Sequence, residues 1–115
     1  MALPAALLAA LPRLEALDLR SNRFTAVPES LSMGLLPRLA VLRLDGNHIG
    51  HVGDGSLQGS PIEALHLSHN RVSRLAPRAF ANVSRLARLD LSYNRIAHLD
   101  SGALQQVKRW INLLL

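Results

Sequence analysis

The chain has 115 residues, of which 49% are hydrophobic and 3% aromatic, and a formal net charge of +5 at pH 7. This length suits one structural unit with a continuous core, and the absence of cysteine excludes a disulfide framework. No apolar run of the sequence is long enough to cross a bilayer as a helix. The composition therefore favours a small folded unit with an aliphatic core.

The first predicted element is a short strand around Leu17 and Leu19, because alternating leucines give a strand one inward face. This strand belongs to the pattern L-x-x-L-x-L-x-x-N-x-φ, in which φ is apolar. The pattern occurs four times, at Leu14, Leu17, Leu19, Asn22 and Phe24; at Leu39, Leu42, Leu44, Asn47 and Ile49; at Ile62, Leu65, Leu67, Asn70 and Val72; and at Leu86, Leu89, Leu91, Asn94 and Ile96. Starts at 14, 39, 62 and 86 lie 25, 23 and 24 residues apart, which predicts a stack of coils with a parallel sheet.

The second half of each copy carries further apolar residues, which predict the inner side of an opposite wall. They are Val27 in the first copy; Val52 and Leu57 in the second; Leu75, Phe80 and Val83 in the third; and Leu99, Leu104 and Val107 in the fourth. Prolines and glycines crowd these segments, which favours irregular or 3₁₀ backbone over a long helix.

The two ends continue the register and predict an excerpt from a longer solenoid or a truncated isoform. Residues 1–13 match the second half of an earlier repeat, and the alternative, that residues 1–12 are a cleaved secretion signal, is disfavoured because the stretch lacks a basic start. Residues 110–115 begin another repeat, with Trp110, Leu113 and Leu115 at its first, fourth and sixth positions. The predicted single unit thus contains a partial repeat at 1–13, full repeats at 14–38, 39–61, 62–85 and 86–109, and a partial repeat at 110–115. Apolar ends without polar caps predict self-association.

An asparagine follows each predicted strand, at the point where the chain turns. Its amide can both donate to and accept from backbone groups that the turn leaves unpaired. We therefore expect a buried ladder, in which each asparagine bonds to its own coil and to the neighbouring one. The ladder residues are Asn22, Asn47, Asn70 and Asn94.

The repeats resemble the "typical" subfamily of leucine-rich repeats. The resemblance lies in the L-x-x-L-x-L-x-x-N segments and in stretches such as Leu75-Ala-Pro-Arg-Ala-Phe80 and Leu89-Asp-Leu-Ser-Tyr-Asn94. That subfamily occurs in small leucine-rich proteoglycans, Toll-like receptor ectodomains and Slit-like proteins. The resemblance implies an α/β solenoid, a right-handed coil with a short parallel β-sheet on the concave face and an irregular or 3₁₀ convex side. It also implies a non-catalytic protein–protein interaction module.

The residues between and after the strand leucines should point out from the concave face, where such solenoids usually bind their partners. The predicted binding residues are Asp18, Arg20, Arg43, Asp45, His66, His69, Arg88, Asp90 and Tyr93. Charges of both signs alternate among them, and tyrosine is enriched at binding hot spots. A polar protein partner fits this surface better than a lipid does. The alternative is that these residues only keep an inert segment in solution.

The residue after each asparagine forms a second predicted series, a basic edge made of Arg23, His48, Arg71 and Arg95. Arginine outnumbers lysine by twelve to one, and its guanidinium suits sulfates and carboxylates, so an acidic glycosaminoglycan is a possible partner. The alternative is a solvated edge or salt bridges to Asp18 and Asp90. Nucleic acid fits poorly, because no aromatic residues interleave with the basic ones.

Catalytic and metal sites find little support in the sequence. His66 and His69 lie three residues apart, yet no cysteine accompanies them and a zinc site needs three or four converging ligands. No nucleophile elbow or phosphate-binding glycine loop occurs, so we expect no enzyme activity, no cofactor and no metal. Asn82-Val-Ser84 is the one N-glycosylation sequon, which makes Asn82 the glycosylation candidate.

Two settings remain open for this predicted interaction module. An extracellular or cell-surface protein is favoured by the subfamily that the repeats resemble. The chain lacks the cysteine-rich caps usual there, and Phe24-Thr-Ala-Val-Pro-Glu-Ser-Leu31 resembles the repeats of cytosolic signalling scaffolds. Absence of cysteine also suits a reducing compartment, so a cytosolic scaffold is the alternative.

Overall fold

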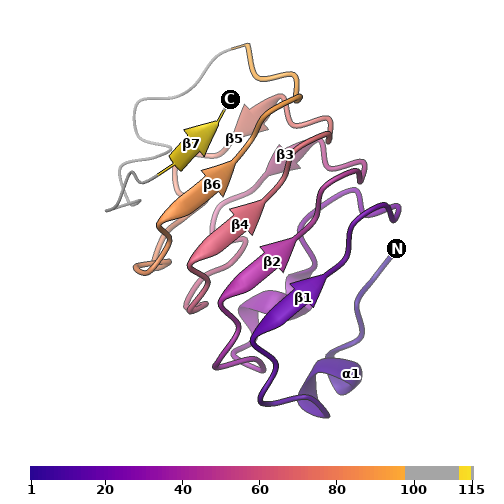
Figure 1. The fold of residues 1–115 in the computed structure, drawn as a ribbon, viewed down its shortest axis with the longest axis vertical. Helices are drawn as coiled ribbons and strands as arrows, with labels where there is room; N and C mark the ends of the chain where they lie inside the picture. Colours follow the sequence, from indigo (N-terminus) through magenta and orange to yellow (C-terminus); the bar gives the residue numbers. More distant parts are fainter. Residues whose placement is uncertain (98–111, 115) are drawn as a thin grey trace.

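The computed structural model describes residues 1–97 and the backbone of residues 112–114. Its main feature is a five-stranded sheet in the order β1-β2-β4-β6-β7, with every neighbouring pair parallel. The strands are β1 (Ala16–Asp18), β2 (Val41–Arg43), β4 (Ala64–His66), β6 (Arg88–Asp90) and β7 (Asn112–Leu114). Figure 1 shows them side by side, one from each coil. The predicted stack of parallel strands is confirmed.

The register of the sheet follows the sequence pattern residue by residue. Leu17 pairs with Leu42, Leu42 with Leu65, Leu65 with Leu89, and Leu89 with Leu113. Equivalent leucines therefore lie on one another from coil to coil, because the unit of one strand and one return segment repeats at nearly constant length.

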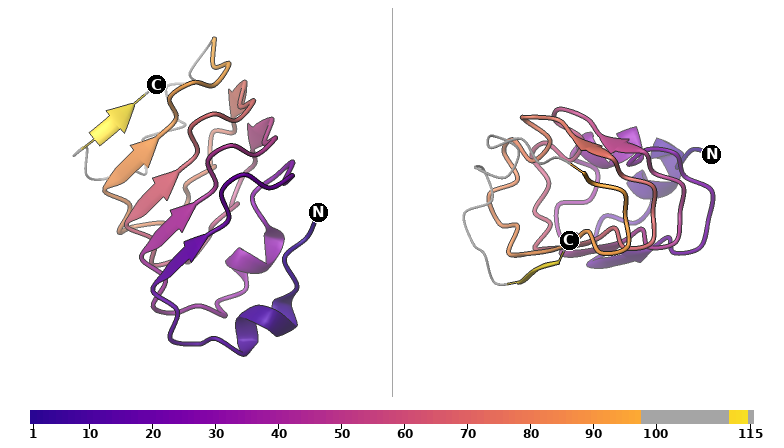
Figure 2. Two further views of the ribbon diagram at one scale, coloured as in Figure 1. Left: turned by 45° about the vertical axis from the view of Figure 1, so that its right-hand side comes forward. Right: turned by 90° about the horizontal axis from the view of Figure 1, so that it is seen from above.

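The wall opposite the sheet is more regular than expected. It contains the 3₁₀ helix η1 (Glu29–Ser32) and a second, two-stranded parallel sheet made of β3 (His51–Val52) and β5 (Arg74–Leu75). Figure 2 shows these elements across the coil from the five-stranded sheet. The sequence prediction of irregular or 3₁₀ backbone missed β3 and β5, each of which is only two residues long. Each buries one side chain, Val52 or Leu75, and exposes the other.

The core lies between the two walls and consists almost entirely of aliphatic side chains. Leu42 and Leu65 of the sheet have no exposed surface, and the same is true of Val52 and Leu57 on the opposite wall. Phe80 is the largest fully buried side chain. The apolar positions predicted in the return segments of the second and third copies therefore do face inward, whereas Leu99, Leu104 and Val107 of the fourth copy lie outside the described residues.

The asparagines after the strands bond coil to coil, as Asn70 illustrates. Its Nδ2 donates to Leu67 O of its own coil at 3.0 Å and to Leu44 O of the preceding coil at 2.9 Å. Its Oδ1 accepts from Ile49 N at 3.1 Å. Asn47 and Asn94 make equivalent bonds. Each of these side chains thus satisfies backbone groups of two coils, which costs less free energy than leaving them unpaired.

Asn22 departs from the expected ladder. Its Nδ2 donates only to Leu19 O and Arg20 O of its own coil, and the side chain is half-buried. The physical reason is that residues 1–13 supply no strand beside β1, so no carbonyl of an earlier coil stands where Leu44 O stands for Asn70. Asn94 makes the bonds between coils but is also half-buried, so the ladder is fully buried only at Asn47 and Asn70.

The N-terminal residues pack against the first coil. Helix α1 (Ala5–Ala9) inserts Leu8, which is 1% exposed, and Ser30 Oγ donates to Leu3 O at 2.7 Å. Leu7 and Leu11 stay exposed, so the predicted apolar N-terminal end is covered in part. At the other end, the side chains of Trp110, Leu113 and Leu115 lie outside the described residues. Self-association through the ends therefore stays a prediction.

Candidate functional site

The outward face of the five-stranded sheet holds the predicted binding residues. Strand alternation turns the leucines inward and leaves the residues between them outside, and the register aligns Asp18, Arg43, His66 and Asp90 in one row across four strands. Asp18 and Arg43 are exposed, whereas His66 and Asp90 are half-buried. The structure therefore brings these four residues, from four different coils, onto one surface.

Asp18 and Arg20 form an ion pair at the first coil. Arg20 Nη2 and Asp18 Oδ2 are 2.7 Å apart, and Arg20 Nε also donates to both carboxylate oxygens. The side-chain hydrogen bonds from Arg20, with its backbone N–H, lower the pKa of Asp18 from its ordinary 3.8 to about 2. The same bonds raise the pKa of Arg20. Both groups therefore remain charged across the neutral range, and each neutralises the other.

The other two carboxylates of the face bond to serines. Asp45 Oδ1 accepts from the N–H and the hydroxyl of Ser68, both at 2.9 Å, and Ser68 belongs to the next coil. Asp90 Oδ1 accepts from the N–H of Ser92 at 3.0 Å and from its hydroxyl at 2.6 Å. These bonds hold both carboxylates in place at the end of the sheet where the strands turn.

Two aromatic side chains of the predicted face stack on one another. The rings of His69 and Tyr93 have centroids 4.3 Å apart and are inclined by 7°. Both residues are exposed, and both lie in the turn just after their strand. They are 24 positions apart in the sequence, so only the stacking of coils brings them together.

The predicted basic edge is exposed at Arg23, Arg71 and Arg95 and half-buried at His48. The expected salt bridges to Asp18 and Asp90 do not form, since the sole salt bridge among the described residues joins Asp18 to Arg20, and the exposure of the three arginines agrees with a solvated edge. The arginines of the basic edge therefore have no carboxylate partner within the described part of the chain.

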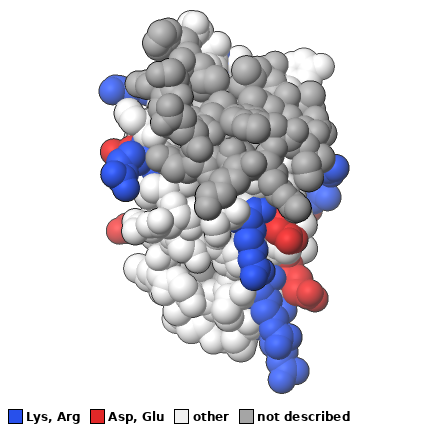
Figure 3. Space-filling model, turned by 90° about the vertical axis from the view of Figure 1, so that its left-hand side faces the viewer, with Lys and Arg blue, Asp and Glu red and all other residues white. Residues whose placement is uncertain are grey.

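Sequence reasoning missed a second series of arginines, which precedes the strands. Arg13, Arg38 and Arg85 each stand directly before the first leucine of a copy, and all three are exposed. Figure 3 shows one side of the molecule, with basic side chains at both edges and in a run at the lower right, where acidic side chains lie beside them. The recurring phrases Pro-Arg-Leu at 12–14 and 37–39 were the signal that could have revealed it.

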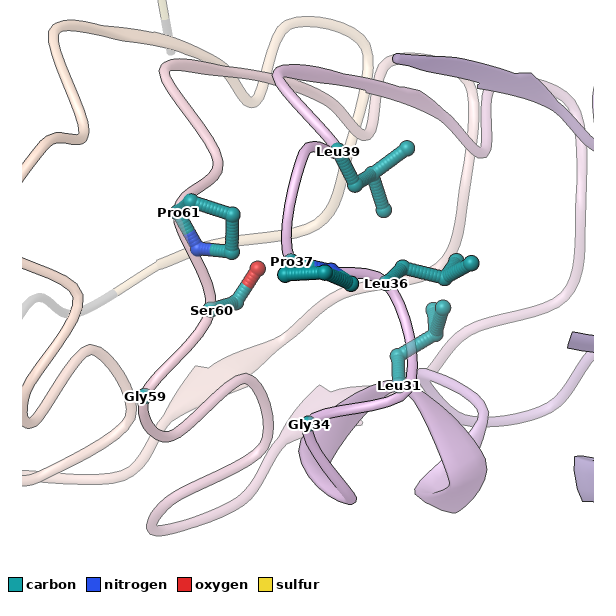
Figure 4. A pocket seen from close by; sticks show the side chains of 8 residues that line it. All are labelled: Leu31, Gly34, Leu36, Pro37, Leu39, Gly59, Ser60 and Pro61. Atoms are coloured by element: carbon teal, nitrogen blue, oxygen red, sulfur yellow. The ribbon is translucent and has the colours of Figure 1, made fainter. Parts of the chain in front are cut away.

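A hollow of about 220 Å³ lies between the loops of the first two coils. Figure 4 shows Leu36 and Pro37 on one side of it and Ser60 and Pro61 on the other. The first copy has one residue more than the third full repeat in this region and the second has one fewer, so the two loops do not match in length. The side chains that line the hollow include no titratable group.

Three further features bear on the sequence predictions. The glycosylation candidate Asn82 is exposed and has a φ of 59°. In the described ranges, no three His, Asp or Glu residues gather as ligands for a metal ion, His66 and His69 included. Nor does any helix there have the length and apolarity that a membrane span requires.

Comparison with known proteins agrees with the repeat geometry. A family model described as leucine rich repeat matches residues 12–62 and 60–114, which together are most of the chain. No curated protein matches the chain significantly. Families of this kind generally mediate protein–protein interactions and are generally non-catalytic. With its parallel strands, its aligned leucines and this match, the chain belongs to the leucine-rich-repeat family.

Proposed function

We propose that the chain is a protein-binding module whose contact surface is the outward face of the five-stranded sheet, taken here as the concave side of the coil. One observation carries the proposal: Asp18, Arg43, His66 and Asp90 form a row of mixed charge across four coils. None of these side chains contributes to the aliphatic core. Such a row offers specificity, because a partner must match the order of its charges.

The arrangement of hydrogen bonds around the face supports a protein partner over a small ligand. The carboxylates of Asp18, Asp45 and Asp90 are already oriented by Arg20, Ser68 and Ser92. Pre-oriented polar groups lose less conformational freedom when a partner binds. The side chains of the face project from strands of three residues each, which form a short sheet suited to contact with another protein surface.

The basic edge supports a second candidate, an acidic glycosaminoglycan. Arg23, Arg71 and Arg95 are exposed without a carboxylate partner in the described ranges, and successive coils repeat at about the 4.8 Å spacing of neighbouring strands. A linear sulfated chain could run along such an edge. Binding of this kind would weaken steeply with added salt, because its energy comes from exposed charges.

For the cellular setting, we propose an extracellular or cell-surface location, with a cytosolic scaffold as the alternative. Exposure of Asn82 favours the first, because a sequon must be accessible to carry a glycan. Expression of the chain behind a secretion signal in mammalian cells tests whether Asn82 is modified. A mass shift that is removed by glycosidase and absent in Asn82→Gln shows that the sequon can carry a glycan, as an extracellular location requires of a glycosylated Asn82. An unmodified secreted chain counts against glycosylation.

The contact surface can be tested without knowing the natural partner. A displayed library of random peptides is selected on the wild-type chain, and each enriched peptide is then measured on Arg43→Glu, on Asp90→Lys and on the matched control Arg78→Glu. Arg78 is exposed, and it follows β5 on the opposite wall. We expect the two face variants to weaken binding roughly tenfold or more, as for a contact worth about 1.4 kcal/mol.

Melting curves of the three variants show whether each is folded. Enriched peptides that ignore both face variants, or that depend on Arg78, would exclude the outward sheet face as the contact surface. A heparin fragment tests the glycosaminoglycan candidate, with its binding measured on the wild type and on Arg23→Gln at low and high salt. Binding that weakens with added salt and also weakens in Arg23→Gln supports this candidate.

A further inference from the structure

One turn position recurs after the strands of the four described coils and holds Ser21, Gly46, His69 and Tyr93. All four residues have a left-handed backbone, with φ angles of 57°, 71°, 54° and 56°. The N–H groups of the first three donate to backbone carbonyls of the next coil. Because serine and glycine satisfy this turn in the first two coils, the turn itself does not require an aromatic ring.

The rings of His69 and Tyr93 are placed where they cost the fold free energy. A bulky residue with a positive φ is uncommon, since its Cβ crowds the backbone, and glycine avoids that crowding. The Tyr93 side chain buries little in return, as the residue is 74% exposed. A strained residue kept on an open surface points to a role in binding rather than in stability.

The stack holds both rings ready for a partner. With centroids 4.3 Å apart and planes inclined by 7°, each ring restricts the rotation of the other before anything binds. Gly46 occupies the same turn position in the coil before His69, on the side away from Tyr93. Because glycine has no side chain, it does not cover the other face of the His69 ring. A flat group of a partner can therefore lie on the stack with little loss of side-chain freedom.

The charges beside the stack select among possible flat partners. Arg71 and Arg95 follow the two rings by two residues, and both are exposed without a carboxylate partner among the described residues. On the strand side of the rings, the carboxylates of Asp45 and Asp90 are already bonded to serines. Asp45 and Asp90 keep their negative charge but are held by these serine hydrogen bonds, whereas the two arginines have no bonded partner in the described ranges and are the groups left to bind a partner's carboxylates.

We propose that His69 and Tyr93 form an aromatic platform for an acidic protein segment, which lays an aromatic side chain on the rings and places carboxylates on Arg71 and Arg95. This proposal rests on the protein-binding function proposed above and names the class of partner. A neutral sugar could stack on the rings but would leave both arginines unused. A sulfated polysaccharide would use the arginines but has no aromatic group for the rings.

The test uses the full chain and a short synthetic peptide with several glutamates around one tryptophan. Tyr93 is the sole tyrosine of the chain, so its ring resonances report contact at the platform directly by NMR. We expect the peptide to shift these resonances. Replacing its tryptophan by alanine should weaken binding about two- to tenfold, the range for loss of one aromatic pair. Replacing its glutamates by glutamine should weaken binding and remove its dependence on salt.

Variants of the chain provide the second arm. His69→Gly and Tyr93→Asn each remove one ring and introduce a residue that tolerates a left-handed backbone. Each should weaken binding of the peptide by a factor similar to that expected for loss of its tryptophan. Ser21→Gly is the matched control for the same turn, and a double Gln variant of Arg74 and Arg78, two exposed arginines of the opposite wall, is the control for the double variant of Arg71 and Arg95. Neither control should change binding. Circular dichroism verifies that each variant is folded, and the NMR shifts of the wild type stand independently of the variants.

The outcomes separate this proposal from the broader one. Peptide binding that leaves the Tyr93 resonances unmoved, or that survives both His69→Gly and Tyr93→Asn, overturns the platform. So does a heparin fragment or a neutral oligosaccharide that moves Tyr93 while the peptide does not. If selected ligands depend on Arg43 but not on Tyr93, the sheet face is the contact surface and only the platform fails. If they depend on Tyr93 but on neither Arg43 nor Asp90, the platform stands and the row of charges on the sheet face is not the contact surface.

Discussion

The first and third coils carry the same pattern but bury it to different extents. Ile62, Leu65 and Leu67 of the third coil have no exposed surface, whereas Leu14, Leu17 and Leu19 of the first are only partly buried. The third coil lies between two others, and the first has only residues 1–13 on its outer side. The comparison teaches that a leucine in this fold is buried by the neighbouring coil rather than by its own.

The asparagines show the same difference in hydrogen bonding. Asn70 joins two coils through its donors and accepts from a backbone N–H, while Asn22 bonds only within its own turn. The sequence positions are equivalent, so the contribution of each residue to stability depends on its place in the stack. Two pairs of substitutions test this comparison, and a fifth substitution tests the ion pair of the first coil, in order of expected effect.

The largest effect is expected for the leucines. Leu65→Ala should lower the free energy of unfolding by about 2–5 kcal/mol, because it leaves a cavity between two coils that cannot close. Leu17→Ala should cost clearly less, since that side chain is already partly exposed. Urea unfolding of the two variants beside the wild type gives both values. Equal losses would show that the first coil is as well packed as the third.

A smaller difference is expected for the asparagines. Asn70→Ala removes bonds to Leu44 O, Leu67 O and Ile49 N, which leaves buried backbone groups unsatisfied at a cost of about 1–3 kcal/mol. Asn22→Ala removes bonds to two carbonyls of its own coil, which water can reach. The melting temperature of Asn70→Ala should therefore lie well below that of Asn22→Ala. Melting temperatures that coincide would contradict the role assigned to the bonds between coils.

The smallest effect concerns the charged pair of the first coil. Arg20→Gln should raise the pKa of Asp18 from about 2 toward 3.8, because the guanidinium bonds that lower it are lost. A depressed pKa stabilises the fold above pH 3.8, and this contribution disappears as the pH falls from 3.8 through 2. Carboxyl carbon NMR over that range measures the change. The melting temperature at neutral pH should hardly move, since both groups are exposed.

Most of the fold could be predicted from the sequence. The strands around Leu17, Leu42, Leu65 and Leu89 follow from alternating leucines, and the register follows from the nearly constant repeat length. Membership of the leucine-rich-repeat family is confirmed on the same residues. These features are local or periodic, so each copy carries the information for its own strand and turn.

Only the tertiary structure decided which equivalent residues differ. Sequence places His69 and Tyr93 in separate copies, and the stacking of coils brings their rings to 4.3 Å. Sequence likewise could not show that Asp18 pairs with Arg20 rather than with the basic edge, or that Asn22 lacks the bonds that Asn70 makes. The pattern fixes what one coil offers to a neighbour. Burial, pairing and exposure depend on which neighbour is there, because every such contact crosses from one coil to the next.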